Sequence, residues 1–291
     1  MPHDRVAVVI PAHDAAGLLR DCLESVIGQL LPDDELVVVD DRSTDATLSV
    51  CAEVGVRVVP NTHAPGPYGA RNCGVGATDA ELLVFFDSRC RARPGWLDHH
   101  RRALAAGSDP VITYSDVAVR PGGSPAGAIA AHMNPFGTAT YRGLGFFPAC
   151  NLGVSRRLWA SVGGFPEVRS GGDETLCRRA VVAGARLDGD STTRVDWTPR
   201  ERFGDLLSQY HRYGRSSYDP SAASPLGFAA RRLPLLPIRA LGTFVGPLSR
   251  RSRFSARMGA AAVQAGFEVG GLRAAAAALR SRTAVPAAAG P

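Results

Sequence analysis

The stretch that decides the fold reads Leu82-Leu83-Val84-Phe85-Phe86-Asp87-Ser88-Arg89 and joins an apolar run directly to polar residues. Five consecutive apolar residues are typical of a strand that is buried on both faces of a parallel sheet. In such sheets, ligands bind beyond the carboxyl ends of the strands. Asp87 therefore stands where an α/β enzyme binds a metal ion or a phosphate group, and Arg89 follows two residues later.

The residues before this stretch alternate between a strand-like and a helix-like pattern of apolar residues. Short β-branched runs predict strands over residues 6–10, 36–39 and 56–59, and apolar residues at helical spacing predict helices over 14–29 and 45–54. Strands and helices that alternate at this spacing favour right-handed βαβ units and a mostly parallel sheet. The sequence therefore predicts an α/β fold, Rossmann-like in its first half, with a central sheet flanked by helices.

The pattern changes after the stretch. Residues 96–106 predict a helix and residues 110–119 a strand, whereas residues 120–141 are rich in Gly, Pro and Ala and show little periodicity. Such a segment is typical of a mobile loop over a site or of an insertion that binds an acceptor. Helices are expected again over residues 156–162 and 174–183.

Composition places a domain boundary near Tyr218. Residues 1–219 are expected to form the α/β domain. Residues 220–285 are expected to form a helical, proline- and arginine-rich extension whose last helix covers 258–279. Residues 286–291 are expected to be a disordered tail.

The extension allows two interpretations. Its apolar clusters at 233–238 and 241–245 are accompanied by arginine pairs at 231–232 and 250–251. Such clusters can lie in the surface of an anionic membrane, which is the interpretation we favour slightly. They can also pack against the α/β domain or against a second subunit.

Composition also limits the class of protein. The 291 residues are 45% apolar and 21% charged, as in a globular protein. The net charge is +6, but the arginines are spread along the chain without interleaved aromatic residues, which argues against nucleic-acid binding. The six cysteines form no CxxC pair and are expected to be buried, reduced thiols. With no signal-peptide pattern and no apolar run of 18 residues, the expected location is the cytoplasm or the inner face of the cell membrane.

Polar residues that could bind a ligand lie at the end of a predicted strand and in a loop. Asp40 and Asp41 end the second predicted strand, where an acid can bind a nucleobase or a ribose or can simply cap a turn. The loop 66–72 offers backbone N–H groups, the Arg71 guanidinium and a helix N-terminus to a phosphate or a base, or is a plain connection. Neither GxGxxG nor GxxxxGK[ST] occurs, which argues against a nicotinamide dehydrogenase and a P-loop enzyme.

Further acids stand at two other positions. Asp87 is placed where a divalent cation that bridges a diphosphate needs an oxygen ligand. Asp173 and Glu174 follow two glycines at the start of a predicted helix, where a carboxylate can take a proton from a hydroxyl group. Taken singly, each of these acids is more often a helix cap or a solvated charge.

The order of these segments strengthens their assignment. They are Val8–Asp14, Val38–Asp45, Gly66–Asn72, Phe85–Cys90 with Pro94–Leu97, Asn151–Arg157 with Val162–Phe165, and Gly172–Arg179. In this order they resemble glycosyltransferase family 2, the inverting GT-A enzymes that move a sugar from a nucleotide diphosphate donor. The resemblance implies a GT-A fold for residues 1–219.

The resemblance also implies roles for single residues. Asp40 and Arg71 would hold the base and ribose of the donor, Asp87 the diphosphate and a Mg²⁺ or Mn²⁺ ion, and Asp173 would deprotonate the acceptor. The other donor-side candidates are Pro11, Asp41, Asn72, Ser88 and Arg89, and the acceptor-side candidates are Asn151, Glu174 and Arg212.

The chain departs from the family pattern at three positions. Arg42 replaces a glycine, Gly172 replaces a glutamate that often precedes the base, and Arg89 replaces the second acid of the DxD motif. A cation in place of an anionic ligand weakens a bound metal. Either Asp87 binds the metal with donor phosphates and waters, or Arg89 itself neutralises the leaving diphosphate. A nucleotide-sugar-binding protein with impaired catalysis is the alternative function.

The expected reaction is a single displacement at the anomeric carbon, with inversion. The expected partners are a nucleotide diphosphate sugar, with UDP the first expectation, and a glycan, lipid or small-molecule acceptor. Residues 209–213 are similar to the QxxRW motif of processive members, but Tyr213 replaces the tryptophan, and Arg212 is expected to contact phosphate.

Overall fold

The structure is a computed structural model, and it describes residues 4–105, 110–133, 137–168, 170–216, 224–235, 239 and 254–283. Contacts divide the chain into two compact units, one formed by Met1–Arg120 and Pro135–Thr198 and the other by Pro121–Asn134 and Pro199–Pro291. The boundary expected at residue 219 differs from this division, because residues 199–216 group with the C-terminal helices.

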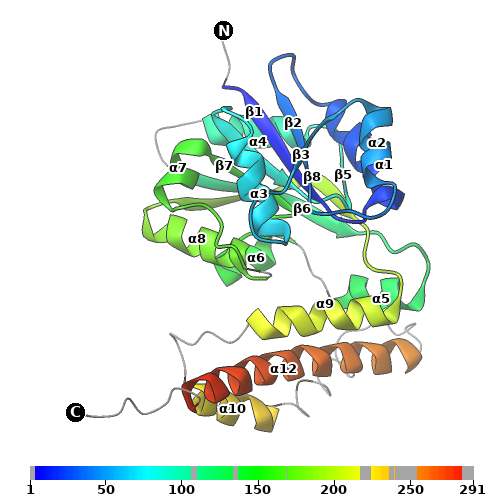
Figure 1. The fold of residues 1–291 in the computed structure, drawn as a ribbon, viewed down its shortest axis with the longest axis vertical. Helices are drawn as coiled ribbons and strands as arrows, with labels where there is room; N and C mark the ends of the chain where they lie inside the picture. The colour runs from blue at the N-terminus through cyan, green and yellow to red at the C-terminus, as the bar shows by residue number, and fades with distance from the viewer. Residues whose placement is uncertain are drawn as a thin grey trace. The chain divides into compact units, whose positions relative to one another are not determined.

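The first unit is built on one mixed sheet that is flanked by helices (Figure 1). In its described residues the strand order is β3-β2-β1-β4-β7-β6-β8-β5. The strands are β1 Val6–Ala12, β2 Glu35–Asp40, β3 Arg57–Pro60, β4 Leu82–Phe86, β5 Cys90–Ala92, β6 Val111–Val119, β7 Asn151–Ser155 and β8 Arg186–Trp197. The helices are α1 Ala16–Ile27, α2 Thr47–Val54, α3 Pro67–Gly76, α4 Trp96–Ala105, α6 Thr138–Leu144, α7 Arg156–Ser161 and α8 Gly172–Val182.

The first four neighbours in the sheet, β3-β2-β1-β4, are parallel, as the alternating pattern predicts. Beyond β4 the sheet is mixed: β7 runs antiparallel to both β4 and β6, β8 runs parallel to β6, and β5 runs antiparallel to β8. Strands β5, β7 and β8 were not predicted from the sequence. Strand β5 has only three residues, β7 contains a glycine, and β8 contains many polar residues, so their pairing is set by the sheet and not by local apolar pattern.

Helix α3 packs unusually close to the sheet at Gly74. A Cβ atom on this residue would lie 2.4 Å from Cγ1 of Val9 and 2.9 Å from Cγ2 of Val39. Any larger side chain would therefore push α3 away from β1 and β2. This close packing fixes α3 against the two central strands and brings its N-terminus to the edge where β1, β2 and β4 end.

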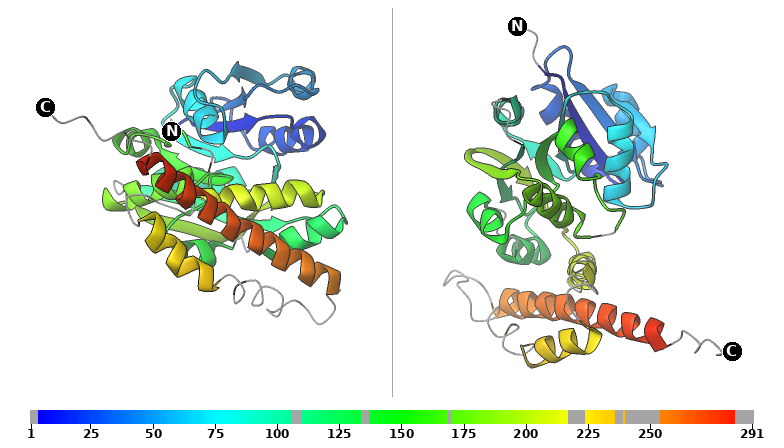
Figure 2. Two further views of the ribbon diagram at one scale, coloured as in Figure 1. Left: turned by 60° about the horizontal axis from the view of Figure 1, so that its bottom comes forward. Right: turned by 90° about the vertical axis from the view of Figure 1, so that its left-hand side faces the viewer.

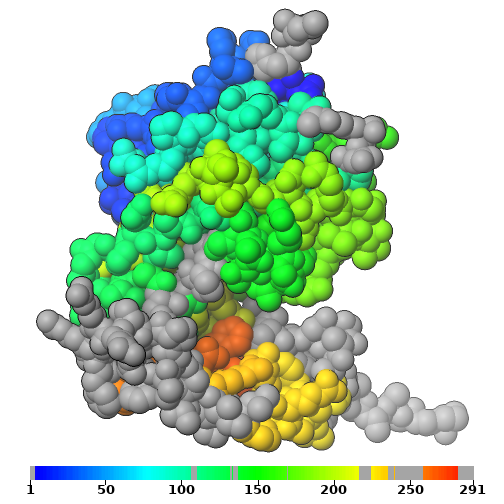
Figure 3. Space-filling model, turned by 180° about the vertical axis from the view of Figure 1, so that it is seen from behind, coloured from blue at the N-terminus to red at the C-terminus, as the bar shows by residue number. Residues whose placement is uncertain are grey.

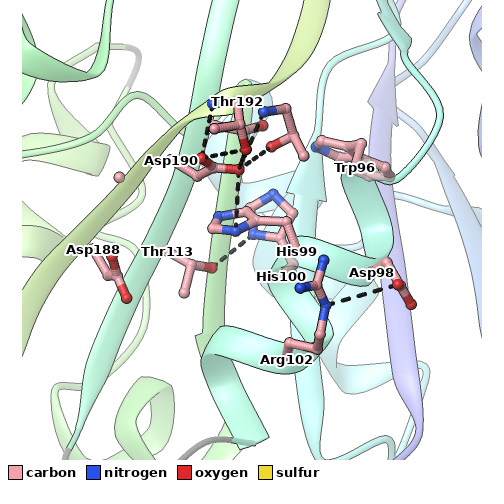
Figure 4. Close-up of polar contacts among 12 residues, drawn as sticks. Trp96, Asp98, His99, His100, Arg102, Thr113, Asp188, Asp190 and Thr192 are labelled. Carbon is pink, nitrogen blue, oxygen red and sulfur yellow. Dashed lines mark hydrogen bonds and ion pairs between the residues drawn. The ribbon is translucent and has the colours of Figure 1, made fainter.

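A tight polar cluster shapes strand β8. The register between β6 and β8 shifts after Ser115, and Asp190 accepts hydrogen bonds from the backbone and hydroxyl groups of Thr192 and Thr193 at this bulge (Figure 4). Burial alone would raise the pKa of Asp190, but these hydrogen bonds outweigh it and lower the pKa to about 2. The ring of His99 lies against the same carboxylate, with its Nδ1 3.6 Å from Oδ2.

The prediction of a loop over residues 120–141 is wrong for most of its length. The segment contains α5, Pro125–Met133, and the start of α6. Helix α5 begins after Ser124, whose hydroxyl accepts the backbone N–H of Gly127 at 2.9 Å, and the distant Glu201 accepts the backbone N–H of Gly122 in the turn before the helix at 2.8 Å. At the start of α6, Asp116 accepts the backbone N–H of Thr138 at 2.7 Å. Ser124 before Pro125 is a local start signal for α5, whereas the contacts with Glu201 and Asp116 leave no local signal in the sequence.

The second unit is helical (Figure 2). Its described elements are α5, α9 Phe203–Ser216, α10 Pro225–Arg232, a 3₁₀ turn η1 Leu233–Leu235, and α12 Phe254–Thr283. Its apolar core consists of Ala126, Ile129, Ala130, Leu206, Tyr210, Ala260 and Val263. Helix α12 (orange) lies against α10 (yellow) in the space-filling view (Figure 3).

The predicted last helix over 258–279 is confirmed and is longer at both ends. The buried Glu268 carboxylate of α12 pairs with Arg232 at 2.7 Å and with Arg239 at 2.8 Å. The predictions for residues 241–245, 250–251 and 286–291 lie outside the described residues. No helix in the described part of the chain is both long enough and apolar enough to cross a bilayer.

The cysteines follow the prediction. All six are free, five of them are buried and Cys73 is half-buried. Burial raises the pKa of Cys177 to about 12, so this thiol is protonated and unreactive at neutral pH.

Candidate active site

The site is built at one edge of the sheet, where β1, β2 and β4 end together. Ala12 of β1 pairs with Asp40 of β2, and Val9 pairs with Phe85 of β4. The parallel register therefore places Pro11, Asp40 and Asp87 at the same edge, where ligands bind in open α/β sheets. The predicted donor-side residues of three separate segments are brought together in this way.

Asp41 holds the start of α3. Its carboxylate accepts the backbone N–H of Gly66 at 2.7 Å, the Asn61 side-chain amide at 2.8 Å and an Arg42 N–H at 2.7 Å. Its side chain is only 11% exposed. Asp40, one residue earlier, accepts the backbone N–H of Ser43 at 3.3 Å. Asp41 thus shapes the loop that precedes α3, and Asp40 shapes the turn beside it.

Arg71 and Asp87 form an ion pair at the end of β4. The Arg71 guanidinium is buried and lies over two aromatic rings, 5.4 Å from the centroid of Tyr68 and 5.9 Å from that of Phe165. Its Nε is buried without a hydrogen-bond partner among the described residues. The Asp87 side chain is 31% exposed. The buried Arg71 guanidinium, whose Nε has no partner among the described residues, therefore lies beside the partly exposed Asp87 carboxylate.

Asp173 is the second residue of α8 and is held on both carboxylate oxygens. Oδ1 accepts the Tyr68 hydroxyl at 2.9 Å, and Oδ2 accepts the backbone N–H of Ala149 at 3.1 Å. Burial and the neighbouring carboxylate raise the pKa of Tyr68 well above its usual value, so its hydroxyl stays a hydrogen-bond donor. An unbroken series of contacts runs from Asp87 through Arg71 and Tyr68 to Asp173.

The segment before α8 is attached to α3 and its loop. The Asn72 amide donates to the carbonyl of Phe165 at 2.8 Å and accepts the backbone N–H of the same residue at 3.1 Å. Glu167 accepts the backbone N–H of Ala64 at 3.1 Å, and its Oε1 lies 2.5 Å from Nδ1 of His63. The hydrogen bond with His63 lowers the pKa of Glu167. The predicted donor residue Asn72 thereby joins the donor side to the segment that carries Asp173.

Asn151 lies in the interior, beneath the site. Its side chain is fully buried, and its Oδ1 accepts the Trp96 indole N–H at 2.6 Å while its amide donates to the carbonyl of Ser115 at 2.7 Å. Oδ1 also lies 3.0 Å from Nε2 of His100, whose Nδ1 contacts the Thr113 hydroxyl at 2.7 Å (Figure 4). Burial lowers the pKa of His100 to about 3, so the ring is neutral. Asn151 thus supports β7 next to β4.

The remaining predicted residues lie at different places. Arg89 donates from Nε to the carbonyl of Thr198 at 2.9 Å, and the backbone N–H of Thr198 donates to the carbonyl of Arg89 at 2.9 Å. Ser88 is half-buried beside Asp87. Glu174 is exposed and pairs with Arg178, one turn further along α8. Arg212 belongs to α9 of the second unit and stays a prediction.

The donor set suits a divalent cation only in part. Among the described residues, no group of three or more His, Cys, Asp or Glu side chains could hold a metal ion. Asp87 offers one carboxylate. Mg²⁺ is commonly bound through one or two carboxylates together with substrate phosphates and waters. The residues therefore fit a cation that arrives with a phosphate ligand, and they do not form a cage that would hold one alone.

Tyr68 is a site residue that was not predicted from the sequence. It lies inside the recognised loop 66–72, but none of the four side-chain positions before Ala70 in that loop was assigned a role. Its position in the first turn of α3, three residues before Arg71, is the signal that points toward the site, because residues three apart share a helix face. Its partner Asp173 is 105 residues away in the sequence, and no local pattern links the two.

Comparisons with known proteins agree with the fold and with the motifs. Residues 7–126 match the model of Glycosyl transferase family 2. The chain is 28% identical to Pre-mycofactocin glycosyltransferase of Mycobacterium tuberculosis in an alignment 271 residues long that covers 85% of this chain and 55% of that protein. It is 27% identical to Glycosyltransferase AglE of Haloferax volcanii, over 72% of each chain. The chain spans about half the length of the mycobacterial relative.

Solved structures share the fold at low sequence identity. The mannosyltransferase PcManGT from Pyrobaculum calidifontis, in complex with GDP-Man and Mn²⁺, superposes with a TM-score of 0.56 and 19% identity, over 98% of this chain and 76% of that chain. Glucosyl-3-phosphoglycerate synthase from Mycobacterium tuberculosis, in complex with Mn²⁺, UDP and glucosyl-3-phosphoglycerate, gives 0.52 and 21%, over 72% and 80%.

Proposed function

Because the chain belongs to glycosyltransferase family 2 and has the GT-A fold, we propose that it transfers a sugar from a nucleoside diphosphate sugar to a hydroxyl acceptor, with inversion at the anomeric carbon. One observation carries this proposal: Asp87, Arg71, Tyr68 and Asp173 form a continuous series of contacts at the carboxyl edge of the sheet. The series joins groups suited to a diphosphate at one end to a carboxylate suited to a hydroxyl at the other.

The proposed reaction is a single displacement. The acceptor oxygen forms a bond to the anomeric carbon while the bond from that carbon to the diphosphate oxygen breaks. The proton of the acceptor hydroxyl passes to Asp173, and the nucleoside diphosphate leaves with the bonding electron pair. Asp173 Oδ1 accepts the Tyr68 hydroxyl and also the backbone N–H of Glu174 at 3.0 Å, whereas Oδ2 accepts only the backbone N–H of Ala149 among the hydrogen bonds of the described residues. Oδ2 therefore retains a lone pair for this proton.

Arg71 is the residue proposed to orient the donor. Its buried Nε has no protein partner among the described residues, and the guanidinium is held in position over the rings of Tyr68 and Phe165. A guanidinium is suited to binding phosphate or sugar oxygens with defined geometry. When a divalent cation is bound with the donor through Asp87, it stabilises the charge on the leaving diphosphate. The Mn²⁺ in the related complexes supports this assignment.

The nucleotide is proposed to be UDP, with GDP as the alternative. Among solved structures with this fold, one protein is in complex with GDP-Man and another with UDP or UDP-Glc. The fold therefore occurs with either nucleotide, each in a different protein. The acceptor is proposed to carry a free hydroxyl on a glycan, a lipid or a small molecule.

A thermal-shift panel tests the donor assignment. UDP-glucose and GDP-mannose are each added to the full chain with Mn²⁺, with Mg²⁺ and with EDTA. A ligand that binds the folded state raises the melting temperature by mass action. We expect one of the two donors to raise it, more strongly with Mn²⁺ than with EDTA, and Asp87→Asn to remove the effect of the metal. No shift with either donor in any buffer contradicts the proposal.

Arg89 motivates the second candidate function, a protein that binds a nucleotide sugar without turning it over. Its guanidinium is tied to the carbonyl of Thr198, whereas a metal-binding DxD motif would have an acid here. The two functions differ in donor hydrolysis, which a glycosyltransferase performs slowly with water as acceptor. A glycosyltransferase is supported if nucleoside diphosphate is released from the donor and Asp173→Asn lowers the rate of release. A protein that only binds the nucleotide sugar is supported if the donor binds and no nucleoside diphosphate is released.

Peripheral membrane contact is proposed for the second unit. Helix α10 and the turn after it expose Leu226 and Leu233, at 67% and 54%, together with Arg231, whereas the neighbouring Arg232 pairs with Glu268. Exposed apolar residues beside an exposed arginine suit the surface of an anionic bilayer. Pelleting with vesicles of phosphatidylglycerol is expected for the wild type and is expected to be lost in the double variant Leu226→Asp/Leu233→Asp. Equal pelleting of both proteins, or of neither, contradicts this contact.

A further inference from the structure

Tyr68 occupies the space in which a side chain at position 172 would lie. A Cβ atom built on Gly172 would stand 2.8 Å from Cδ2 and Cγ of the Tyr68 ring and 2.9 Å from its Cδ1. Real Cβ atoms do not approach ring carbons this closely. The backbone of Gly172 does not require glycine, because its φ is outside the left-handed region and it is the first residue of α8. Glycine is therefore needed here for the ring and not for the turn.

The ring is held firmly where it lies. Tyr68 is 6% exposed, its ring centroid lies 5.4 Å from that of Phe165, and the Arg71 guanidinium lies over its face. Phe165 packs in turn edge-on against Phe85 of β4, at 4.8 Å between centroids. Aromatic pairs at these distances are favourable, and a cation over the ring adds to them. A ring fixed in this way can place its hydroxyl with little freedom.

The hydroxyl is directed at the Asp173 carboxylate. Its hydrogen bond to Oδ1, at 2.9 Å, is donated by a neutral group to an anionic one, which makes it stronger than a bond between two neutral groups. Oδ2 is held from the other side by the backbone N–H of Ala149. The carboxylate plane is therefore fixed by one side chain from α3 and by two backbone N–H groups, those of Ala149 and Glu174.

We propose that Tyr68 is a positioning residue for Asp173, and that the missing side chain at Gly172 is what admits the tyrosine ring to this place. The proposal rests on the proposed role of Asp173 as the base that accepts the proton of the acceptor hydroxyl. Tyr68 carries Arg71 on its ring face and Asp173 at its hydroxyl, so a single side chain fixes the spacing between the donor-binding cation and the base. This couples the geometry of the two halves of the site.

The first test removes only the hydroxyl. Tyr68→Phe keeps the ring under Arg71, and nucleoside diphosphate release is followed with UDP-glucose or GDP-mannose, whichever stabilises the wild type. We expect kcat to fall about tenfold with the donor KM unchanged, since a hydrogen bond to a charged group is lost from the reacting complex. The donor KM is the second readout, because a general loss of structure around Arg71 and Asp87 would raise it.

The same substitution in an Asp173→Asn background separates this proposal from the function on which it rests. If Asp173→Asn leaves turnover unchanged, the proposed role of Asp173 is wrong. If Asp173→Asn lowers turnover while Tyr68→Phe leaves kcat unchanged, only the role of Tyr68 is overturned. The proposal is supported if Tyr68→Phe alone lowers kcat with the donor KM unchanged and causes no further loss in the Asp173→Asn background.

The second test concerns the space at Gly172 and needs no activity. Gly172→Ala is expected to lower the melting temperature by about 2–8 °C in the wild type, because the added methyl group forces the ring to move. In a Tyr68→Ala background it is expected to raise the melting temperature, because alanine favours a helix over glycine. Gly17→Ala is the matched control: Gly17 lies in the first turn of α1, with no atom within 4 Å of its Cβ position. An equal effect of Gly172→Ala in both backgrounds overturns the steric part of the proposal.

Discussion

At the scale of single residues, the proposed function depends on which carboxylate takes the proton. Asp173 and Glu174 are adjacent in α8, but Asp173 accepts hydrogen bonds from Tyr68 and Ala149, whereas the Glu174 side chain is 42% exposed and pairs with Arg178. A base that must meet one hydroxyl in one orientation needs support of the kind that Asp173 has. These contacts are the reason for proposing Asp173 and not Glu174.

We predict that Asp173→Asn lowers kcat by about 10²–10⁴, the usual contribution of a general base. The amide keeps the shape of the side chain, so the melting temperature should change little. Asp98→Asn is the control, because Asp98 also lies in the first turn of a helix but is exposed and is assigned no role in the site. Steady-state release of the nucleoside diphosphate measures both variants. Similar turnover in the Asp173 and Asp98 variants would exclude Asp173 as the base.

Arg42 is strained at the position where the family pattern has glycine. Its φ is 65°, in the left-handed region, and its side chain pairs with Asp41. The left-handed conformation costs a residue with a Cβ about 1–2 kcal/mol, whereas a half-exposed ion pair contributes about 0–1 kcal/mol. We predict that Arg42→Gly is more stable than Arg42→Ala by about 1 kcal/mol in urea denaturation. Both variants lose the ion pair, so equal stabilities would show that the backbone carries no strain.

At the scale of elements, the first half of the fold is predictable and the second half is not. Strands β1 to β4 and helices α1 to α4 carry strong local patterns of apolar residues. Strands β7 and β8 and helix α6 depend on partners far away in the sequence, such as Asp116 for α6, and Glu201 holds the turn before α5. Local patterns do not encode such contacts. In residues 120–141 the content of Gly, Pro and Ala outweighed one local start signal, Ser124 before Pro125.

The same division holds for the site. Ordered motifs point to the ends of β2 and β4 and to the starts of α3 and α8, which the structure connects. They do not show that Asp41 is used to hold Gly66, or that Asn151 is enclosed by Trp96 and Ser115. A motif records which residue types recur, and only the fold shows whether each side chain faces a ligand or the interior.

One buried ion pair ties elements of the sheet unit together. Asp34, just before β2, has no exposed side-chain area and accepts two hydrogen bonds from Arg101 of α4 and one from the backbone N–H of Val6. We predict that Asp34→Ala destabilises the protein by about 3–5 kcal/mol, because it leaves a buried charge without its partner. Asp33→Ala, at the exposed neighbouring position, should have almost no effect. Urea denaturation of both variants checks this, and similar midpoints would contradict it.

At the scale of the whole molecule, stability is expected to depend on pH through acids with lowered pKa values. The pKa of Asp190 lies at about 2, and that of Asp34 also lies below its ordinary value of 3.8, since hydrogen bonds outweigh burial in both. A lowered pKa in the folded state means that the unfolded state binds protons first as the pH falls. Stability is therefore full at neutral pH and is lost as the pH falls below 3.8 toward about 2.

Denaturation at a series of acid pH values measures this loss. Asp190→Asn should give a flatter dependence on pH than the wild type, with lower stability at neutral pH, because the amide cannot titrate and accepts fewer of the hydrogen bonds from Thr192 and Thr193. The same slope in the variant and the wild type would show that Asp190 does not contribute.

Titration calorimetry of UDP and GDP with Mn²⁺ tests the central claim most directly, namely that the series from Asp87 to Asp173 is a nucleotide-sugar site. Arg71→Gln removes the cation at the centre of the series, and Arg91→Gln, on the exposed position of β5, removes a cation elsewhere. The account predicts that one nucleotide binds the wild type and Arg91→Gln with equal affinity and binds Arg71→Gln at least about tenfold more weakly. Equal affinity for a folded Arg71→Gln, or no binding of either nucleotide to the wild type, would contradict it.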